Sequence, residues 1–369
     1  MELPETILQF GGGSFLRAFA DVFVHEANAR GEAVGRIVVV QSTDGNRAAL
    51  LNAQRGRYHV VFRGLSDGER IDRTLAVRSI SRALIAKSEW AEVIQVAQSP
   101  ALRMVISNTT EAGYTLIDND DPEMPRSFPA RLLCILKARY RAGLPGLSVL
   151  PCELVEPNGD LLRELVLGQA VAWRLDSGLQ DWIRREVRWV NTLVDRIVSG
   201  RPDAHPLLAS DRLLTAAEPF ALWAVEGKAE APFAHPCVRY VPDVRPYALR
   251  KVRILNGAHT ALVCKARPSG PRTVREAVGD PAIGKWLRRV VFEEIVPALE
   301  YVVEDAGQFA EQVLERFANP FLDHRLEAIA LHHDEKVRVR LMPTYEAYLK
   351  AFGRPPELLG EILALYRAS

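Results

Sequence analysis

Three polar residues in one short segment have side chains that could reduce a carbonyl group. Lys251, Asn256 and His259 occur in the sequence KVRILNGAH. If this segment is an α-helix, in which each residue advances by about 100°, then Lys251, His259 and Asn256 fall at about 0°, 80° and 140°. The three side chains would then share one broad face of the helix.

Reducing a ketone requires a hydride at the carbon and a proton at the oxygen. A lysine whose pKa is lowered by burial or by nearby cations can donate this proton near neutral pH. An asparagine amide can hold the developing alkoxide, and a histidine can orient the lysine or bind substrate hydroxyls. Spacing alone leaves a structural interpretation open. A helical lysine is usually solvated, an asparagine before a glycine usually marks a turn, and a single histidine is usually structural.

A glycine-rich turn near the N-terminus indicates a dinucleotide site. The segment Thr6–Phe10 reads as a short buried strand, Gly11-Gly12-Gly13 follows it, and Phe15–Ala27 has helical spacing. Glycines allow a tight turn close to a pyrophosphate, whose charge is favoured at a helix N-terminus. Because Leu16 occupies the place of a third glycine, a turn without a ligand stays an alternative. The predicted cofactor-binding residues are Gly11, Gly13, Ser14 and Phe15.

An acidic residue follows the second predicted strand, Arg36–Gln41. Asp44 could accept hydrogen bonds from the adenosine ribose hydroxyls, which would select NAD over NADP. Two alternatives stay open, because Arg47 could instead hold a 2′-phosphate and Asp44 could simply cap a helix.

Further polar residues follow the predicted strand Met104–Ser107. Asn108 and Thr109 would lie at the carboxyl edge of the sheet, where ligands bind in open α/β folds. They could line the nicotinamide ribose there. The alternative is a run of N-cap residues that opens a helix.

The alternation of strand-like and helix-like segments predicts an α/β fold class, with a Rossmann-like dinucleotide-binding domain followed by a mainly α-helical C-terminal domain. We expect the boundary near Pro242, with domains at residues 1–242 and 243–369. The alternating pattern of Tyr58–Val77 predicts a hairpin on the edge of the same sheet. The other predicted elements are a strand at Leu147–Leu150, amphipathic helices at Leu161–Leu175 and Leu179–Val198, a strand at Val238–Val241, and helices from Tyr247 onward.

The composition argues against several classes of protein. The 369 residues carry a formal net charge of +1 and show no basic stripe of the kind that binds nucleic acid. The apolar stretches are shorter than the roughly 20 residues needed to span a bilayer, and the N-terminal sequence MELPETILQF lacks the basic region of a signal peptide. The four cysteines form no C-x-x-C pair, so we expect reduced thiols, no metal site and a cytoplasmic location.

The pattern of Lys251, Asn256 and His259 resembles the signature of the mannitol dehydrogenase family, the polyol-specific long-chain dehydrogenases. Longer blocks look like the tagaturonate reductase (altronate oxidoreductase) branch of that family, and the resemblance runs from Ile7 to near Tyr345. These blocks are Val40–Asp44, Leu51–Gln54, Ser107–Gly113, Pro151–Leu154, Asn158–Leu167, Leu193–Val198 and Arg250–Val263.

The resemblance implies a metal-free enzyme whose site lies in a cleft between the two domains. It implies that Lys251 is the general acid and base, and that Asn256 and Asn158 hold the oxyanion. It also implies that His259 contacts the substrate and that Lys336 is a substrate-binding lysine. Arg17 resembles the arginine that follows the glycines in this family, and we expect it near the cofactor phosphates.

Two departures from the family pattern bear on the substrate. Mannitol dehydrogenases carry an arginine where this chain has Ala328, which argues against mannitol. Members of the tagaturonate reductase branch continue beyond the last helix of this chain, so we expect part of the cleft wall to be missing or rebuilt.

A hexuronate substrate brings a carboxylate, which needs a cationic partner. Lys336, Arg338 and Arg340 are candidates, with Lys336 and Arg338 taken as the substrate-binding pair. An exposed basic face is the alternative for the two arginines.

Together these residues predict NAD(H)-dependent, reversible reduction of a hexuronate ketone, D-tagaturonate to D-altronate. A fructuronate reductase and a mannitol or polyol 2-dehydrogenase are alternatives, and a non-catalytic NAD-binding sensor is the alternative from another class. The expected partner is a small sugar acid or polyol, with no nucleic acid and no membrane. The sequence does not indicate an oligomeric state.

Overall fold

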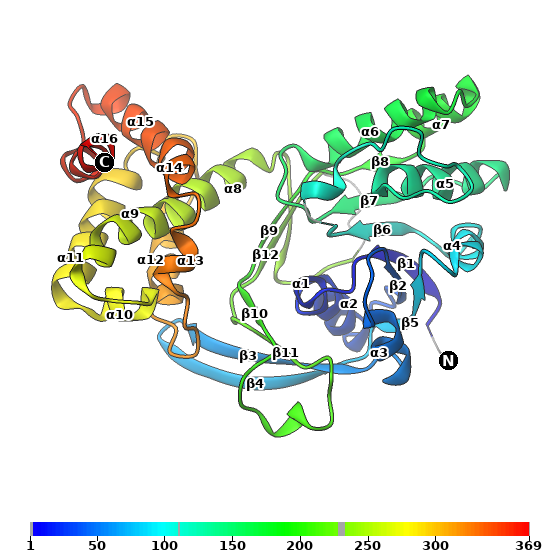
Figure 1. Cartoon of the computed structure of the whole chain (residues 1–369), viewed down its shortest axis with the longest axis horizontal. Coiled ribbons are helices and arrows are strands. Elements are labelled where there is room, and N and C mark those ends of the chain that lie inside the picture. Colours follow the sequence, from blue (N-terminus) through cyan, green and yellow to red (C-terminus); the bar gives the residue numbers. More distant parts are fainter. Residues whose placement is uncertain (1–2, 110, 228–232, 369) are drawn as a thin grey trace. The chain divides into compact units, whose positions relative to one another are not determined.

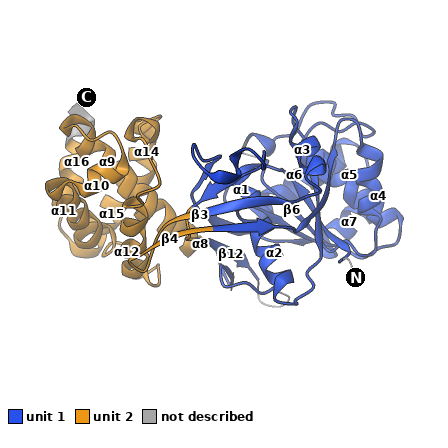
Figure 2. Cartoon of the chain, turned by 90° about the horizontal axis from the view of Figure 1, so that it is seen from below, with its two compact units in different colours: residues 1–61, 74–217, 221–244 blue, residues 62–73, 218–220, 245–369 orange. Residues whose placement is uncertain are grey.

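The structure of the protein, a computed structural model, describes residues 3–109, 111–227 and 233–368 (Figure 1). The chain divides into two compact units (Figure 2). Unit 1 contains residues 1–61, 74–217 and 221–244, and unit 2 contains residues 62–73, 218–220 and 245–369. The units therefore differ from the predicted division at residues 1–242 and 243–369, because two short segments of the first part group with the second.

Unit 1 is built around a six-stranded parallel sheet with the strand order β5-β2-β1-β6-β7-β8 (Figure 1). Counted among themselves, these strands follow the order 3-2-1-4-5-6, which is that of Rossmann-like dinucleotide-binding sheets. The predicted fold class is therefore confirmed. The strands are β1 (Glu5–Phe10), β2 (Arg36–Gln41), β5 (Ile80–Ile85), β6 (Met104–Ser107), β7 (Ser148–Pro151) and β8 (Arg188–Trp189).

Helices α4 to α7 contribute apolar side chains to one buried cluster with the central strands. In this cluster Leu8 of β1 and Val105 of β6 are grouped with Val93 of α4 and Leu132 of α5. Short apolar strands of this kind suit the middle of a parallel sheet. The helices of unit 1 are α1 (Ser14–Arg17), α2 (Ala20–Ala29), α3 (Arg47–Ala53), α4 (Trp90–Ala97), α5 (Phe128–Arg141), α6 (Asn158–Ala172) and α7 (Ser177–Arg185), with 3₁₀ turns at Glu111–Gly113 and Pro206–Leu208.

The carboxyl ends of the central strands are in register. Phe10 at the end of β1 pairs with Val40 of β2 and with Ser107 of β6, and Ser107 pairs with Pro151 of β7. The loops after these strands therefore leave the sheet at one edge. This edge carries the glycine turn and the polar residues that follow β2 and β6.

The hairpin predicted at Tyr58–Val77 is present, but its predicted place on the edge of the central sheet is wrong. Its strands belong to a separate sheet with the order β10-β11-β3-β4, and β5 takes the edge position beside β2. Asp67 and Gly68 both have positive φ (54° and 79°) and form the two-residue turn. The strands outside the central sheet are β3 (Tyr58–Ser66), β4 (Glu69–Val77), β9 (Thr192–Asp195), β10 (Val198–Gly200), β11 (Thr215–Ala217), β12 (Leu222–Glu226) and β13 (Val238–Val241).

The amphipathic helix predicted at Leu179–Val198 is wrong beyond Arg185, where α7 ends. The chain continues as the short strands β8, β9 and β10, and β9 pairs with β12 in a third sheet that also contains β13. Helical spacing could not reveal this, because a strand forms here by pairing with a segment far along the chain. The helix predicted at Leu161–Leu175 is α6, which begins at Asn158 and ends at Ala172.

Unit 2 is mainly helical, as predicted, and its apolar side chains form a large buried cluster. Some of its turns are π-helical, a rare and wider form that is frequent at functional sites. The π-helical segments are Lys251–Asn256, Val290–Ile295 and Val337–Leu341. The other helices are α8 (Arg245–Arg250), α9 (Gly257–Ala266), a 3₁₀ turn at Arg267–Ser269, α10 (Val274–Gly279), α11 (Pro281–Arg289), α12 (Ala306–Phe317), α13 (Leu326–Ile329), α14 (His333–Lys336), α15 (Met342–Phe352) and α16 (Glu357–Ala368).

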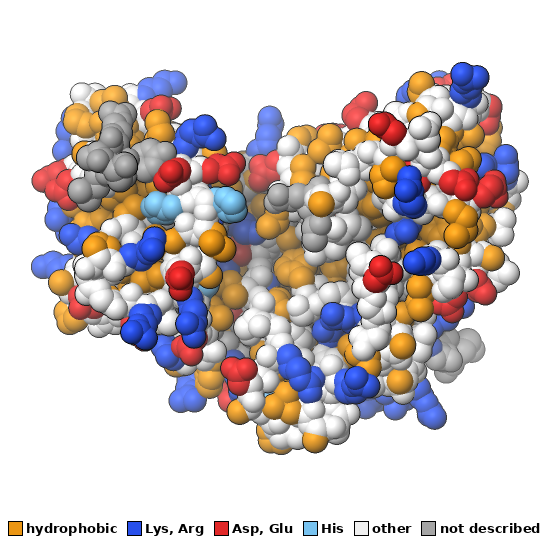
Figure 3. All heavy atoms as spheres, in the orientation of Figure 1, with side chains coloured by type: hydrophobic (Ala, Val, Ile, Leu, Met, Phe, Trp, Pro, Cys, Tyr) orange, Lys and Arg blue, Asp and Glu red, His pale blue; other side chains and the backbone are white. Residues whose placement is uncertain are grey.

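The surface carries charges of both signs. On the face shown in Figure 3, the described Lys and Arg side chains are interspersed with Asp and Glu. Within the described ranges, no helix combines the length and the apolar character that crossing a membrane would require.

A buried ion pair stabilises the interior of unit 2. Arg316 of α12 donates from Nε and from one terminal nitrogen to the Glu218 carboxylate at 2.9 Å and 2.8 Å, and both side chains are only 2% exposed. The guanidinium also lies 4.2 Å from the ring centroid of Phe220. Breaking such a pair is costly, because the remaining charge stays buried.

Glu218→Gln keeps the shape of the side chain and removes its charge. We expect it to lower the free energy of unfolding by about 3–5 kcal/mol, because the Arg316 charge loses its buried partner. Urea unfolding measures the change. Glu311→Gln is the matched control, since the Arg288–Glu311 pair is exposed and should contribute less than about 1 kcal/mol. Equal effects of the two changes would contradict this view of the buried pair.

Candidate cofactor and active site

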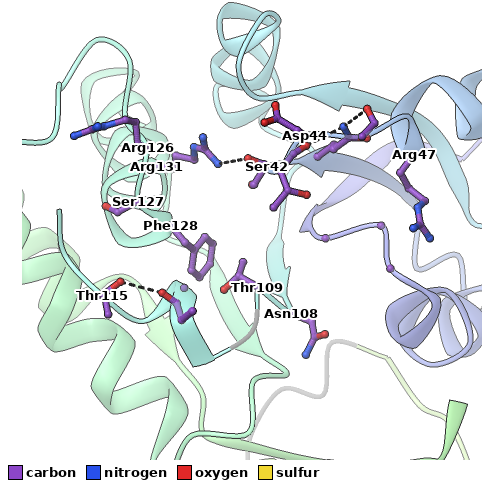
Figure 4. Close-up of a pocket in the computed structure, with 18 of the residues that line it drawn as sticks. Ser42, Asp44, Arg47, Asn108, Thr109, Thr115, Arg126, Ser127, Phe128 and Arg131 are labelled. Atoms are coloured by element: carbon purple, nitrogen blue, oxygen red, sulfur yellow. Dashed lines mark hydrogen bonds between the residues drawn. The ribbon is translucent and has the colours of Figure 1, made fainter.

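A cavity of about 480 Å³ lies at the carboxyl edge of the central sheet (Figure 4). Its walls come from the glycine turn after β1, the loop after β2, the loop after β6 and the start of α5. The predicted residues that line it are Gly11, Gly13, Asp44, Asn108 and Thr109. Ser14 and Phe15 are half-buried in α1 and do not line it.

The glycine turn is shaped by two backbone requirements. Gly11 has a φ of 115°, and a Cβ atom there would lie 3.0 Å from the backbone oxygen of Asn108. Gly11 therefore permits both the turn and the close approach of the loop after β6. Gly13 is exposed, and a Cβ atom there would meet no other atom within 4 Å, so its backbone is open to a ligand.

One buried side chain fixes the loop after β2. Gln41 donates from Nε2 to the backbone oxygens of Thr43 and Gly45 at 3.0 Å and 2.9 Å. Its Oε1 accepts the backbone N–H of Ala48 at 2.7 Å. The loop that these bonds hold carries Asp44, and Arg47 follows it as the first residue of α3; both residues are exposed and line the cavity. The sequence pattern indicated the exposed residues Asp44 and Arg47 but not the role of Gln41.

Glu153 holds the loop after β6 in the same way. Its buried carboxylate accepts the Ser107 hydroxyl at 3.0 Å, the backbone N–H and the hydroxyl of Thr109 at 2.8 Å and 3.1 Å, and the Tyr114 hydroxyl at 3.3 Å. Burial raises the pKa of Glu153, and the bonds from Thr109 act in the opposite direction. Glu153 belongs to a block of the family resemblance, which did not indicate this role, although an acid two residues after a buried strand was an available signal.

A second cavity of about 370 Å³ shares the loop Gln41–Gly45 with the first. Its other walls include Ile85 and Trp90, which give it an apolar side suited to a flat ring. Arg131 of α5 lines both cavities and donates to the backbone oxygen of Ser42 at 3.4 Å (Figure 4).

Arg17, which was expected near the cofactor phosphates, does not line the cavity. It is buried beneath the glycine turn, where Nε donates to the backbone oxygen of Gly12 at 3.2 Å and a terminal nitrogen donates to that of Leu213. The predicted continuous helix Phe15–Ala27 is also interrupted between α1 and α2. Arg17 therefore stabilises the glycine turn through its hydrogen bond to Gly12.

A buried carboxylate adjoins this arginine. Asp21 is fully buried, and Tyr58 donates to its Oδ2 at 3.1 Å. Burial raises the pKa of Asp21 to about 7, although the Tyr58 and Gln9 side chains and the Arg17 charge favour ionisation. Asp21 is therefore largely protonated in the folded protein below neutral pH.

In unit 2 the segment that carries the predicted acid and base is π-helical from Lys251 to Asn256, and α9 begins only at Gly257. The spacing derived for a continuous α-helix is therefore wrong for this segment. Lys251 and Asn256 are half-buried, and the hydroxyl of Thr260 donates to the backbone oxygen of Asn256 at 2.9 Å.

His259 is 7% exposed and stacks on Phe317, with ring centroids 4.0 Å apart. Its ring also meets the ring of His324 edge-on at 5.1 Å. Burial lowers the pKa of His259 well below its usual value, and the nearby His324, Arg316, Arg340 and Lys336 act in the same direction. His259 is therefore neutral near pH 7 and can donate or accept a hydrogen bond.

Asn158 is engaged within unit 1. Its side chain is 2% exposed, and its Nδ2 lies 3.0–3.2 Å from the backbone oxygens of Pro151, Glu153 and Thr192. Its Oδ1 accepts the Thr192 backbone N–H at 2.9 Å. Because an amide nitrogen has two hydrogens, these carbonyl groups already occupy it. Asn158 thus ties together the chain after β7 and the start of β9.

The predicted substrate-binding residues also lie in unit 2. Lys336 ends α14 and is half-buried, whereas Arg338 is exposed. Arg340, in the π-helical segment Val337–Leu341, is half-buried.

The strand order, the glycine turn and a cavity at the carboxyl edge together define unit 1 as a dinucleotide-binding domain of the Rossmann type. Two family models match consecutive parts of the chain. The Mannitol dehydrogenase Rossmann domain matches residues 5–234, and the Mannitol dehydrogenase C-terminal domain matches residues 243–367. The chain therefore belongs to the mannitol dehydrogenase family, which confirms the resemblance seen in the sequence.

Similar proteins include two altronate oxidoreductases. The one from Bacillus subtilis (strain 168) is 39% identical, with 97% of this chain and 78% of that protein covered. The one from Halalkalibacterium halodurans is 41% identical, with 97% and 73% covered. Among solved structures, a ternary complex of Pseudomonas fluorescens mannitol 2-dehydrogenase with NAD and D-mannitol is 26% identical with a TM-score of 0.79, covering 99% of this chain and 79% of that one.

Asp21 predicts an unusual dependence of stability on pH. Because burial raises its pKa to about 7, the folded state keeps a proton that the unfolded state loses from about pH 4 upward. The free energy of unfolding should therefore fall by up to about 1.4 kcal/mol per pH unit from this group between those values and level off above pH 7. Asp21→Asn removes this contribution. The free energy of unfolding of the variant should therefore rise relative to that of the wild type as pH increases from 4 to 7. Urea titrations at several pH values measure this difference. If the free energies of unfolding of the two proteins change with pH in parallel, the prediction is wrong.

Proposed function

We propose that this protein catalyses the reversible reduction of D-tagaturonate to D-altronate. More broadly, it is an NAD(H)-dependent oxidoreductase of the mannitol dehydrogenase family that acts on a sugar acid or polyol. The observation that carries the narrower proposal is the identity of 39% and 41% to altronate oxidoreductases over 97% of the chain. We assign cofactor binding to the domain at residues 1–242 and substrate binding to the domain at residues 243–369.

The residues of the cavity fit a dinucleotide. Gly11 and Gly13 expose backbone that a pyrophosphate could approach, and the loop held by Glu153 presents Asn108 and Thr109. Asp44 lies on the loop shared with the second cavity. The apolar wall of that cavity would take the adenine, and Asp44 would accept hydrogen bonds from the adenosine ribose. When bound, NADH supplies the hydride that reduces the ketone.

The proton would come from Lys251. Its place in a half-buried π-helical turn beside Asn256 supports this role, because an amine partly withdrawn from water is the usual form of a lysine acid or base. Asn256 would donate to the substrate oxygen as it gains negative charge. His259, buried and neutral, would hold a substrate hydroxyl.

Asn158 would assist the same oxygen only by giving up one of its present bonds. Its Nδ2 is shared among three backbone oxygens at 3.0–3.2 Å, and a substrate oxygen would have to replace one of them. Its proposed role as a second oxyanion donor therefore requires a rearrangement of the chain after β7.

Initial rates with D-tagaturonate, D-fructuronate, D-fructose and D-mannitol test the substrate. We expect the highest kcat/KM with D-tagaturonate. A higher kcat/KM with D-mannitol or D-fructose would overturn the hexuronate assignment, and a higher value with D-fructuronate would change the proposed hexuronate. NADH binding without turnover of any of the four would favour the sensor alternative.

Lys251→Ala should lower kcat by about a hundred- to ten-thousandfold, because the reacting oxygen loses its proton donor. Binding of NADH, measured by fluorescence titration, should be retained. Lys285→Ala is the control, since Lys285 is an exposed lysine of α11. If Lys251→Ala keeps its rate with an unchanged pH profile, another group moves the proton.

Glu153→Gln tests the loop after β6. The amide keeps one acceptor oxygen, so its NH₂ group would face either the donors of Thr109 or the hydroxyl of Ser107, and the loop should lose part of its present hydrogen bonding. We expect weaker NADH binding by roughly five- to a hundredfold, which corresponds to about 1–3 kcal/mol for buried groups left unpaired. The matched control is Glu164→Gln, whose side chain is exposed. Equal dissociation constants for the two variants would count against this role.

A further inference from the structure

Unit 2 contains a cluster of side chains that can carry positive charge, formed by Lys336, Arg340, His259 and His324. Burial and the other three groups all act to lower the pKa of His259, and burial and Arg340 lower that of Lys336. Within the described part of the chain, no carboxylate lies at ion-pair distance from Lys336 or Arg340. Because His259 is neutral, the excess of positive charge in the cluster comes from Lys336 and Arg340, and an anion would balance it.

Arg316 does not add to this excess, because the Glu218 carboxylate neutralises it. His324 contributes an unsatisfied hydrogen-bonding atom. Its Nδ1 is buried and has no hydrogen-bond partner among the described residues. A buried polar atom without a partner is unfavourable, and a ligand could satisfy it.

Among the described residues, each of the two cations donates to one neutral oxygen. Lys336 donates from Nζ to the backbone oxygen of Ile329 at 2.8 Å. Arg340 donates from one terminal nitrogen to the Thr260 hydroxyl oxygen at 3.3 Å. A guanidinium has five N–H donors in a planar fork, so most of the donors of Arg340 are available for a planar, two-oxygen acceptor.

Arg340 is linked through Thr260 of α9 to the segment that carries the proposed chemistry. The hydroxyl that accepts its bond belongs to Thr260, and that hydroxyl donates to the backbone oxygen of Asn256. The two π-helical segments also contact each other, since Arg253 donates to the backbone oxygen of Val339 at 3.3 Å. An anion held by Arg340 would therefore lie near Asn256.

Arg338 has none of these features. It is exposed, although only one residue, Val339, separates it from Arg340 in the sequence. The π-helical turn of Val337–Leu341 places the one arginine in solvent and the other, half-buried, against α9. The choice of Arg338 in the sequence-based pair is therefore not the one that the contacts favour.

We propose that Arg340, with Lys336, forms the subsite that binds the carboxylate of a sugar acid, and that Arg340 distinguishes sugar acids from neutral polyols. This inference rests on the proposed function for the identity of the reaction. The subsite itself requires only that the ligand is a polyhydroxy carboxylate. If Arg340 only positioned Thr260, its loss would change the KM values for acidic and neutral substrates equally.

Steady-state kinetics of Arg340→Gln in the full chain separate these roles. We expect KM for D-tagaturonate to rise by roughly ten- to a hundredfold, as for the loss of one charge-assisted pair, with a smaller change in kcat. KM for D-fructose or D-mannitol should change by less than about threefold. Arg340→Lys, which keeps the charge but not the fork, should lie between the wild type and Arg340→Gln.

Two further variants guard against a general effect of lost charge. Lys350→Gln removes an exposed cation of α15 and is the control. Arg338→Gln tests the competing arginine. The proposal is overturned if Arg338→Gln raises KM for the hexuronate more than Arg340→Gln does, or if Arg340→Gln changes acidic and neutral substrates equally.

A binding measurement keeps this test independent of turnover. With NADH present, D-gluconate should raise the melting temperature of the wild type and of Lys350→Gln, but not of Arg340→Gln, whereas D-mannitol should have similar effects on all three. If the wild type reduces no hexuronate and the gluconate effect still depends on Arg340, the proposed function fails and the subsite stands. If the wild type reduces D-tagaturonate and Arg340→Gln has an unchanged KM, the subsite fails and the function stands. A variant that unfolds before NADH is added is replaced by Arg340→Lys, for which an unchanged KM also overturns the proposal.

Discussion

The chain leaving β1 must pass very close to the chain leaving β6, and the cofactor cavity depends on this approach. A Cβ atom at Gly11 would lie 3.0 Å from the backbone oxygen of Asn108. That oxygen follows Ser107, which pairs with Phe10 in the central sheet, so it cannot retreat without disturbing the register. A larger residue would separate the strand ends that form the walls of the cavity. The positive φ of 115° adds a second reason for glycine at this position.

Buried polar side chains hold the loops around that cavity from inside. Gln41 fixes the loop after β2, Glu153 fixes the loop after β6, and Arg17 bonds to the glycine turn from below. Burying such groups is unfavourable unless they are hydrogen-bonded, and each of them has several partners. Mobile loops would have to be ordered when a ligand binds, whereas loops held in this way are already in place.

Unit 2 combines π-helical turns with a local excess of positive charge. The π-helical segments Lys251–Asn256 and Val337–Leu341 contact each other, and their side chains include the proposed proton donor and the half-buried Arg340. Burial and the nearby positive groups also keep His259 neutral. A polar group for the ketone and a positive group for a distant carboxylate are the two requirements of a sugar-acid substrate.

The order of local signals in the sequence was enough to predict the fold class and several site segments. The apolar runs that became β1, β2, β6 and β7, the glycine turn and the acid on the loop after β2 all follow from local chemistry. The Lys251, Asn256 and His259 pattern identified the family through resemblance, whereas its spacing taken as an α-helix was wrong. The hairpin Tyr58–Val77 was predicted as a hairpin but placed in the wrong sheet, because strand pairing depends on distant partners.

Tertiary structure decided the features that arise from contacts between distant segments. Arg17 and Arg340 show this clearly, because neither their residue types nor their neighbours in sequence indicate which way they face. Arg17 is buried because Gly12 and Leu213 offer it backbone oxygens, and Arg340 is half-buried because Thr260 lies against its segment. Local sequence determines which conformations a segment prefers, but the burial and charge of a side chain depend on which remote residues surround it.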